Sequence, residues 1–195
     1  MIAHRNFASY EDYVYRQGGK ARSKREWLLS HLPKNTASFE QTFLDAKPML
    51  KPGAVLCLGA RTGAESLGAV AAGFTGSVGI DLHPVGPTVL EGDWHDLPFP
   101  DASFQNVYCN SLDHCLHLDK LAAQVKRVLV KDGRFYVMAT NRQSSVDRWK
   151  LKPGNEAMYW DTSDELRDLI VSHGFDVNWT WHAGKWGHYV FVVKR

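Results

Sequence analysis

The sequence lacks long apolar runs. None of its 195 residues lies in an apolar stretch as long as the roughly 18–20 residues that a transmembrane helix needs. Residues 1–10 also lack the apolar segment of a secretory signal. These absences argue against a membrane-spanning helix and predict a cytoplasmic protein.

Cysteine is scarce, and no metal-binding spacing is present. Cys57, Cys109 and Cys115 are odd in number and stand in or beside apolar runs. They predict reduced, buried thiols rather than disulfides. An aspartate and two histidines within 113–117 lack a fourth ligand at a suitable spacing, so no metal site is expected.

The composition is otherwise that of a globular protein, with 44% hydrophobic and 23% charged residues. Tryptophan is abundant: five of the seven lie between positions 149 and 186. These rings either line an aromatic cleft for a planar or apolar substrate or fill the core. Trp179 and Trp181 share one face of an expected strand, which favours core packing for that pair.

Positive charge is concentrated at the start of the chain. The whole sequence carries a net charge of +2, whereas residues 1–36 hold seven basic and three acidic side chains, a net charge of +4. Arg22, Lys24 and Arg25, beside Trp27, could contact phosphate groups. A solvated helix face is the more frequent arrangement for so modest a charge, so a nucleic-acid partner is not expected.

Apolar runs alternate with helical patterns after residue 53, which predicts an α/β fold. The expected architecture is a Rossmann-like, mostly parallel seven-stranded sheet with an antiparallel C-terminal hairpin strand. Residues 1–52 are expected to form an N-terminal helical arm or lid, and 53–195 the core with a cap at 140–162. Strands are expected at 55–58, 78–81, 88–90, 104–109, 134–139, 175–181 and 189–193, and helices at 10–15, 21–32, 38–50, 64–72, 118–130 and 161–173. Gly18-Gly19 is expected to separate the first two helices.

Ligands of such a sheet bind beyond the carboxyl ends of its strands. The first strand ends in Gly59-Ala60-Arg61-Thr62-Gly63, and the second ends at Asp81, about 20 residues later. Arg61 stands where the dinucleotide fingerprint needs its second glycine, so hydride transfer with a nicotinamide cofactor is disfavoured. A carboxylate at Asp81 can accept hydrogen bonds from two ribose hydroxyls.

Two further segments carry a specific resemblance. Residues 97–104 read LPFPDASF, and residues 127–134 read RVLVKDGR. Together with the glycine loop, this pattern resembles class I S-adenosylmethionine-dependent methyltransferases of the ubiquinone and menaquinone biosynthesis type. The resemblance covers roughly residues 54–139 and implies S-adenosylmethionine as cofactor and a small-molecule methyl acceptor.

The resemblance also implies roles for particular residues. The implied cofactor site comprises Gly59, Ala60, Arg61, Gly63, Asp81, Leu82, Asp93, Trp94 and Asn110. The glycine loop would surround the methionine moiety, Asp81 would hold the ribose, and Leu82 would lie against the adenine. Asp93 would accept from the adenine amino group, with Trp94 beside the ring and Asn110 near the sulfonium.

The chain departs from this family at several points. Cys57 replaces an acidic residue, Arg61 replaces a glycine, and Gln105 replaces an aspartate. Only 11 residues separate Asp81 from Asp93, so the helix between the second and third strands is expected to be missing.

Methyl transfer requires alignment of the acceptor and, where necessary, a base. His114 is the first candidate base and His95 the second, because both adjoin the cofactor slot and imidazole titrates near neutral pH. Residues 109–112 read CNSL rather than an Asn-Pro-Pro-Tyr type motif, which argues against methylation of exocyclic base amines or glutamine. The alternatives are a non-catalytic cofactor-binding or regulatory module and a nucleic-acid methyltransferase that uses the basic arm.

Overall fold

A computed structural model describes residues 2–4, 7–140, 156–183 and 186–194. Its main feature is a seven-stranded sheet in the order β4-β3-β2-β5-β6-β9-β8. The first five of these strands run parallel, and β9 is antiparallel to both β6 and β8. The strands are β2 (Val55–Leu58), β3 (Val78–Asp81), β4 (Val89–Glu91), β5 (Phe104–Cys109), β6 (Leu129–Thr140), β8 (Phe175–Ala183) and β9 (Trp186–Val193). The predicted architecture is confirmed.

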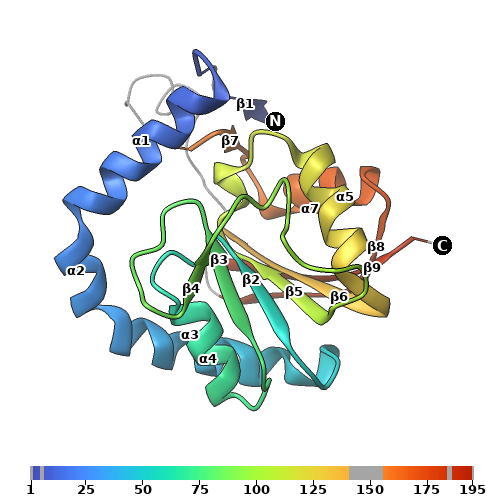
Figure 1. Ribbon diagram of the computed structural model, residues 1–195. Helices are drawn as coiled ribbons and strands as arrows, with labels where there is room; N and C mark the ends of the chain where they lie inside the picture. Colours follow the sequence, from blue (N-terminus) through green and yellow to red (C-terminus); the bar gives the residue numbers. More distant parts are fainter. Residues whose placement is uncertain (1, 5–6, 141–155, 184–185, 195) are drawn as a thin grey trace.

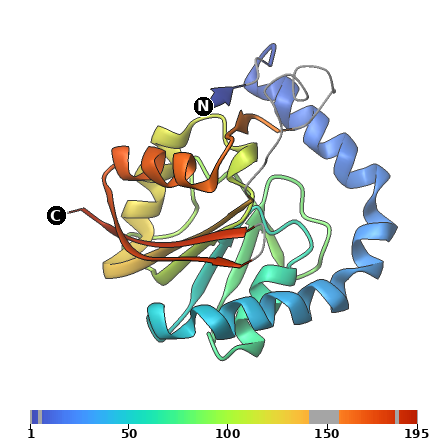
Figure 2. The same cartoon turned by 180° about the vertical axis from the view of Figure 1, so that it is seen from behind.

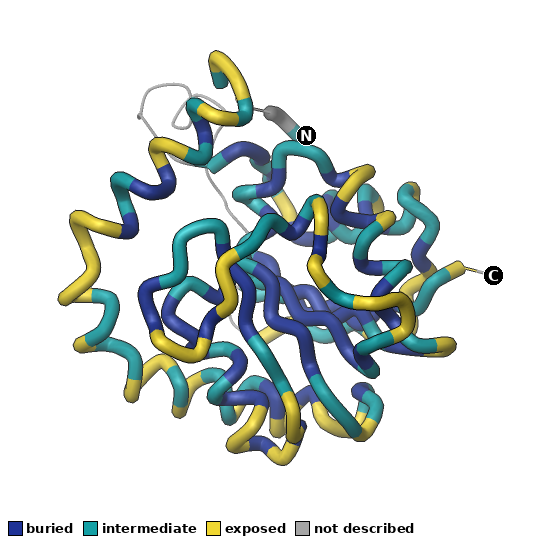
Figure 3. The backbone as a smooth tube through the Cα atoms, in the orientation of Figure 1, coloured by how far each residue is buried: buried dark blue, intermediate teal, exposed yellow. Residues whose placement is uncertain are grey.

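Helices cover both faces of the sheet (Figures 1 and 2). The helices α3 (Leu32–Ala46) and α4 (Ala64–Ala71) pack on one face, and α5 (Leu118–Val128) and α7 (Ser163–Ser172) pack on the other. Alternate residues of β2 serve the two layers: Cys57 packs with the α3 and α4 layer, and Leu56 packs with the other. The central strands are therefore buried on both sides (Figure 3).

The start of the chain forms an arc of helices along one side of the molecule (Figure 1). It comprises α1 (Tyr10–Ser23), α2 (Arg25–Ser30), α3 and the short helix η1 (Lys47–Met49). The predicted break at Gly18-Gly19 is wrong, because α1 runs through both glycines and ends before Lys24. A Cβ at Gly18 would lie 3.0 Å from Cε1 of His83, so this glycine lets the helix approach the core closely.

No helix lies between β3 and β4, where all of residues 82–88 are described, and this confirms the predicted loss. Hydrogen bonds to two other segments hold the connecting loop in place. The amide of Val85 donates to the Arg61 carbonyl at 2.7 Å, and Nε2 of His83 lies 2.8 Å from the Val14 carbonyl of α1. The arm thus contacts the loop that replaces the helix.

A second, two-stranded sheet was not predicted. It pairs β1 (Ala3–His4) with β7 (Met158–Tyr159) in antiparallel register. Each strand is too short to show a periodic pattern in the sequence. The expected cap at 140–162 lies largely outside the described residues, as does Trp149.

The tryptophans near the C-terminus differ in burial and in their contacts. Trp160 is buried, and its Nε1 donates to the Thr140 carbonyl at 2.8 Å. Trp181 stacks on His188 with ring centroids 4.5 Å apart. The expected core packing of Trp179 is wrong: this side chain is 53% exposed, because it lies on the edge strand β8 next to a register shift.

All three cysteines are buried and free, as predicted. Within the described part of the chain, no helix has the length and apolar character needed to span a bilayer.

Candidate active site

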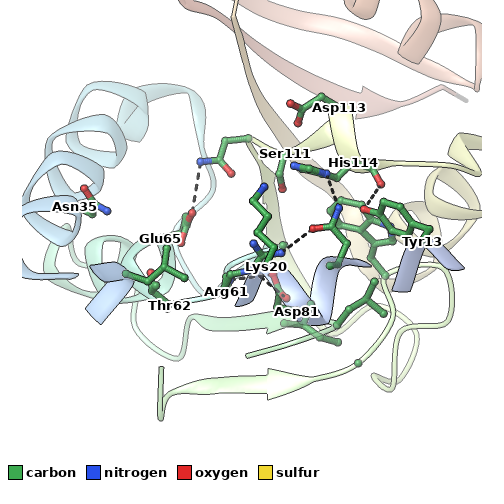
Figure 4. A pocket seen from close by; sticks show the side chains of 18 residues that line it. Tyr13, Lys20, Asn35, Arg61, Thr62, Glu65, Asp81, Ser111, Asp113 and His114 are labelled. Atoms are coloured by element: carbon green, nitrogen blue, oxygen red, sulfur yellow. Dashed lines mark hydrogen bonds and ion pairs between the residues drawn. The ribbon is translucent and has the colours of Figure 1, made fainter. Parts of the chain in front are cut away.

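A cavity of about 410 Å³ lies at the carboxyl ends of the parallel strands. Gly59 follows β2, Asp81 ends β3 and Asn110 follows β5, and all three line it. Tyr13 and Lys20 of α1 line it from the arm, and Figure 4 shows them with Asp81. The volume falls in the range of roughly 300–1,000 Å³ that is typical of ligand sites.

The glycine loop brings backbone to the cavity wall. Gly59 has φ +68°, and a Cβ there would collide with Ser111 and approach Trp94 to 3.1 Å. Gly63, with φ +84°, caps the start of α4. Gly63 does not line the cavity itself, and neither does Ala60, which is buried against the sheet. These two residues shape the loop.

Asp81 and Arg61 form the charged centre of the cavity. Oδ2 of Asp81 accepts from the Arg61 amide at 3.1 Å, and Oδ1 accepts from the His83 amide at 2.8 Å. Nε of Arg61 lies 3.8 Å from Oδ1 of Asp81, and Nη2 donates to Oε1 of Gln17 at 3.2 Å. The Nε atom is buried and has no hydrogen-bond partner among the described residues. The site therefore holds an unused donor beside a carboxylate.

Asp93 and His95 are not among the residues that line the cavity, and they contact the arm and each other. Oδ2 of Asp93 accepts from the Tyr10 hydroxyl at 2.6 Å, and Oδ1 accepts from the His95 amide at 2.8 Å. Burial opposes the charge of Asp93, but the hydrogen bonds from His95 and Tyr10 outweigh it and lower the pKa of Asp93 to about 2. Both carboxylate oxygens are thus engaged, and the hydrogen bond from Tyr10 holds α1 against the core. The neighbouring Trp94 does line the cavity.

His114 lines the cavity and is also tied to the arm. The Tyr13 hydroxyl donates to its carbonyl at 2.8 Å, and Nε2 of Gln17 lies 3.2 Å from its Nδ1. Because Gln17 accepts from Arg61 through Oε1, its amino group faces the imidazole, and Nδ1 accepts. Burial lowers the pKa of His114, which favours this neutral form. The lone pair that a base would use at Nδ1 is therefore the one that Gln17 occupies.

Glu65 and Lys20 line the cavity but were not among the site residues predicted from the sequence. Glu65, in the first turn of α4, lies with Oε1 3.5 Å from Nδ2 of Asn110, and burial raises the pKa of Glu65 to about 7. Lys20 of α1 lines the same cavity, and burial lowers its pKa. Glu65 stands only two residues after the glycine loop and could have been noticed there. Lys20 is far from every motif in the sequence.

The cavity gathers most, but not all, of the predicted site. Its lining includes Gly59, Arg61, Asp81, Leu82, Trp94, Asn110 and His114. It excludes Ala60, Gly63, Asp93 and His95. No group of three His, Cys, Asp or Glu side chains that could hold a metal ion occurs within the described ranges.

A family model described as a methyltransferase domain matches residues 56–137, the stretch that supplies β2 to β6 and the loops of the cavity. These residues are a methyltransferase domain. The chain as a whole has the fold of S-adenosylmethionine-dependent methyltransferases. No curated protein sequence matches the chain.

Solved structures of methyltransferases share this fold at low sequence identity. A Burkholderia thailandensis 1,6-didemethyltoxoflavin-N1-methyltransferase, solved with 1,6-didemethyltoxoflavin and S-adenosylhomocysteine, has a TM-score of 0.71 and 17% identity over 100% of this chain and 95% of its own. A Thermotoga maritima protein described as a possible histamine N-methyltransferase has a TM-score of 0.63 and 19% identity, over 93% and 99% of the two chains. An Aquifex aeolicus S-adenosylmethionine-dependent methyltransferase has a TM-score of 0.60 and 15% identity, over 79% and 89%.

Proposed function

We propose that this methyltransferase transfers the methyl group of S-adenosylmethionine to a small-molecule acceptor. The observation that carries the proposal is the cavity at the ends of β2, β3 and β5, where an acidic strand end, a glycine loop and an aromatic wall meet. This arrangement offers an acceptor pair for ribose hydroxyls and an apolar surface for adenine.

The residues present fit the cofactor. A Cβ at Gly59 would fill the space between Ser111 and Trp94, so only glycine leaves that part of the cavity open. The buried Nε of Arg61 offers a donor, suited to a carboxylate such as that of the methionine moiety. Asp81 would hold the ribose hydroxyls. Bound S-adenosylmethionine supplies an electrophilic methyl group.

The arm is proposed to act as a lid. Tyr13, Gln17 and Lys20 of α1 complete the cavity, and the contact of Tyr10 with Asp93 holds this helix in place. By covering the opening they would exclude water and hold the reacting groups in one orientation. Residues 1–52, which precede the core in the sequence, would then act as a lid over the first cavity.

The small-molecule assignment draws on the relatives. Two of the similar structures are named for methylation of nitrogen in small molecules. The basic side chains Arg22, Lys24 and Arg25 are exposed, but they do not line the cavity beside Asp81. Methylation of nucleic acid predicts retention on RNA or DNA that falls steeply with salt, and absence of retention at low salt would eliminate it.

Calorimetric titration with S-adenosylhomocysteine, the demethylated product, tests the proposal. We expect saturable binding with one site, followed by turnover of S-adenosylmethionine in the presence of an acceptor. No heat at millimolar ligand would refute cofactor binding. The ion pair between Arg61 and Asp81 gives the non-catalytic alternative its support, because it already occupies part of the ribose site. Binding without turnover on any acceptor would favour that alternative.

A further inference from the structure

A second cavity, of about 480 Å³, adjoins the first. Its roof is α3, which contributes Phe39 and Asp45. Its floor is formed by β6, β8 and β9, which contribute Met138, Trp181 and His188. None of the motifs in the sequence pointed to this space.

The floor of the second cavity is a stack of flat rings. Trp181 stacks on His188 with centroids 4.5 Å apart and an interplanar angle of 13°, and Tyr136 lies 5.6 Å from Trp181 at 24°. The Tyr136 hydroxyl lies 2.8 Å from Nδ1 of His188. Burial lowers the pKa of His188 to about 4, so the imidazole is neutral near pH 7. The floor therefore presents an uncharged aromatic surface.

The charges around this surface have one sign. Asp45 and Glu65 line the second cavity, and no lysine or arginine does so among the described residues. Carboxylates beside aromatic faces attract cations, since the ring quadrupole and the negative charge act together. A carboxylate or phosphate ligand would meet repulsion here.

The two cavities meet at three residues. Asn35, Glu65 and Asn110 line both of them. Asn110 follows β5, the strand end at which the reacting sulfur is expected. A ligand in the second cavity would thus reach the methyl group past Glu65 and Asn110.

We propose that the second cavity holds the methyl acceptor and that this acceptor is a planar ring compound bearing a basic nitrogen. The inference rests on the proposed function and adds the class of substrate. The stacked pair of Trp181 and His188 forms the aromatic wall that the ring contacts, Asp45 at the mouth attracts the positive charge, and Glu65 contacts the nitrogen that is methylated.

The transfer step balances with Glu65 as the proton acceptor. The bound ammonium group first gives one proton to the Glu65 carboxylate, which frees the nitrogen lone pair. The lone pair then forms the new bond to the methyl carbon while the bond between sulfur and that carbon breaks, and the electron pair of the broken bond stays on sulfur. A carboxyl group whose pKa is raised by burial can take up a proton near neutral pH.

Binding of matched probes tests the charge preference. Tryptamine, tryptophol and indole-3-propionate share a ring and differ in the charge of the side chain. Benzylamine and benzoate provide the same contrast on a smaller ring. With the full chain saturated with S-adenosylhomocysteine, we expect calorimetry to show each amine binding at least tenfold more tightly than its carboxylate partner.

Single substitutions test which side chains cause the preference for amines over carboxylates. Asp45→Asn should weaken tryptamine binding by about fivefold, and Glu40→Gln, on the same helix outside the cavity lining, should not change it. Glu65→Gln should lower methyl transfer to an amine of the panel by about 100-fold while its binding of S-adenosylhomocysteine stays within a few fold. A thermal melt of each variant verifies folding.

These experiments distinguish a failure of the proposed function from a failure of the proposed amine site. If S-adenosylhomocysteine does not bind, the proposed function fails and the inference fails with it. If it binds but no amine exceeds its carboxylate partner, or Asp45→Asn and Glu40→Gln behave alike, the amine site is wrong and the proposed function survives. Full turnover of an amine by Glu65→Gln would eliminate Glu65 as the proton acceptor.

Discussion

The two cavities meet at Asn35, Glu65 and Asn110 but are built from different parts of the chain. The first is formed largely by loops at the ends of parallel strands, within the methyltransferase domain, and carries charges of both signs. The second is formed largely by α3 and the antiparallel strands β8 and β9, outside that domain, and is aromatic and acidic. In the proposed function, the matched domain supplies the cofactor half of the site and the surrounding elements supply the acceptor half.

The largest effect is expected at the glycine loop of the first cavity. Gly59→Val adds a side chain where Ser111 and Trp94 already lie, at a positive φ that a branched residue adopts poorly. Calorimetry should show S-adenosylhomocysteine binding weakened at least ~100-fold, or about 2.8 kcal/mol. Gly19→Ala is the control, because its Cβ meets nothing within 4 Å and alanine favours the helix. Near-normal binding by Gly59→Val would contradict the close approach.

The next effect tests whether the cofactor half depends on charge. Asp81→Asn keeps the shape of the side chain and removes the negative charge that ribose hydroxyls would meet. Loss of such charged hydrogen bonds costs roughly 1.5–3 kcal/mol, so affinity for S-adenosylhomocysteine should fall about 10- to 100-fold. Asp176→Asn, on the exposed edge strand, should bind like the wild type. Equal affinities for the two variants would remove Asp81 from the site.

A smaller effect is expected on the stability of the contact between the arm and the core. Tyr10→Phe removes the hydroxyl that donates to Asp93 at 2.6 Å and should destabilise the docked arm by about 1–2 kcal/mol. Hydrogen exchange should accelerate in α1 and stay unchanged in α4. Tyr15→Phe is the matched control, since Tyr15 is 75% exposed. Uniform acceleration in both helices would mean that the arm and the core unfold together.

The smallest effect concerns Glu65, at the junction of the cavities. Burial raises the pKa of Glu65 from 4.5 to about 7, so the folded state holds this proton more tightly than the unfolded state. Its contribution to stability is present below pH 4.5 and is lost as the pH rises through 7. Glu65→Gln does not titrate, and its Tm should match the wild type at pH 5 and exceed it by a few degrees at pH 8. A constant difference between the two proteins at both values would contradict the raised pKa.

Local patterns predicted the core strands well. β2, β3 and β5 begin and end at the predicted residues, because each is a short apolar run bounded by turn residues. The same loops then brought Gly59 and Asp81 to one cavity, since the carboxyl ends of parallel strands meet at one edge of the sheet.

Other predictions depended on partners that are distant in the sequence. Gly18 resembles a helix break in isolation, but His83 occupies the space beside it in the folded protein. Asp93 resembles an adenine acceptor, but Tyr10 approaches from 83 residues away and takes one of its oxygens. Such pairings follow from how the arm docks, which no local pattern encodes.

The sheet, the methyltransferase resemblance and the strand ends that line the first cavity could be predicted from the sequence alone. These features follow from hydrophobic periodicity and from turns within a few residues. The arm contacts of Asp93 and His114, the exposure of Trp179 and the existence of the second cavity became visible only in the folded structure. Each of these depends on packing between α1 or α3 and strands far along the chain, and side-chain burial, charge and pKa are properties of such packing.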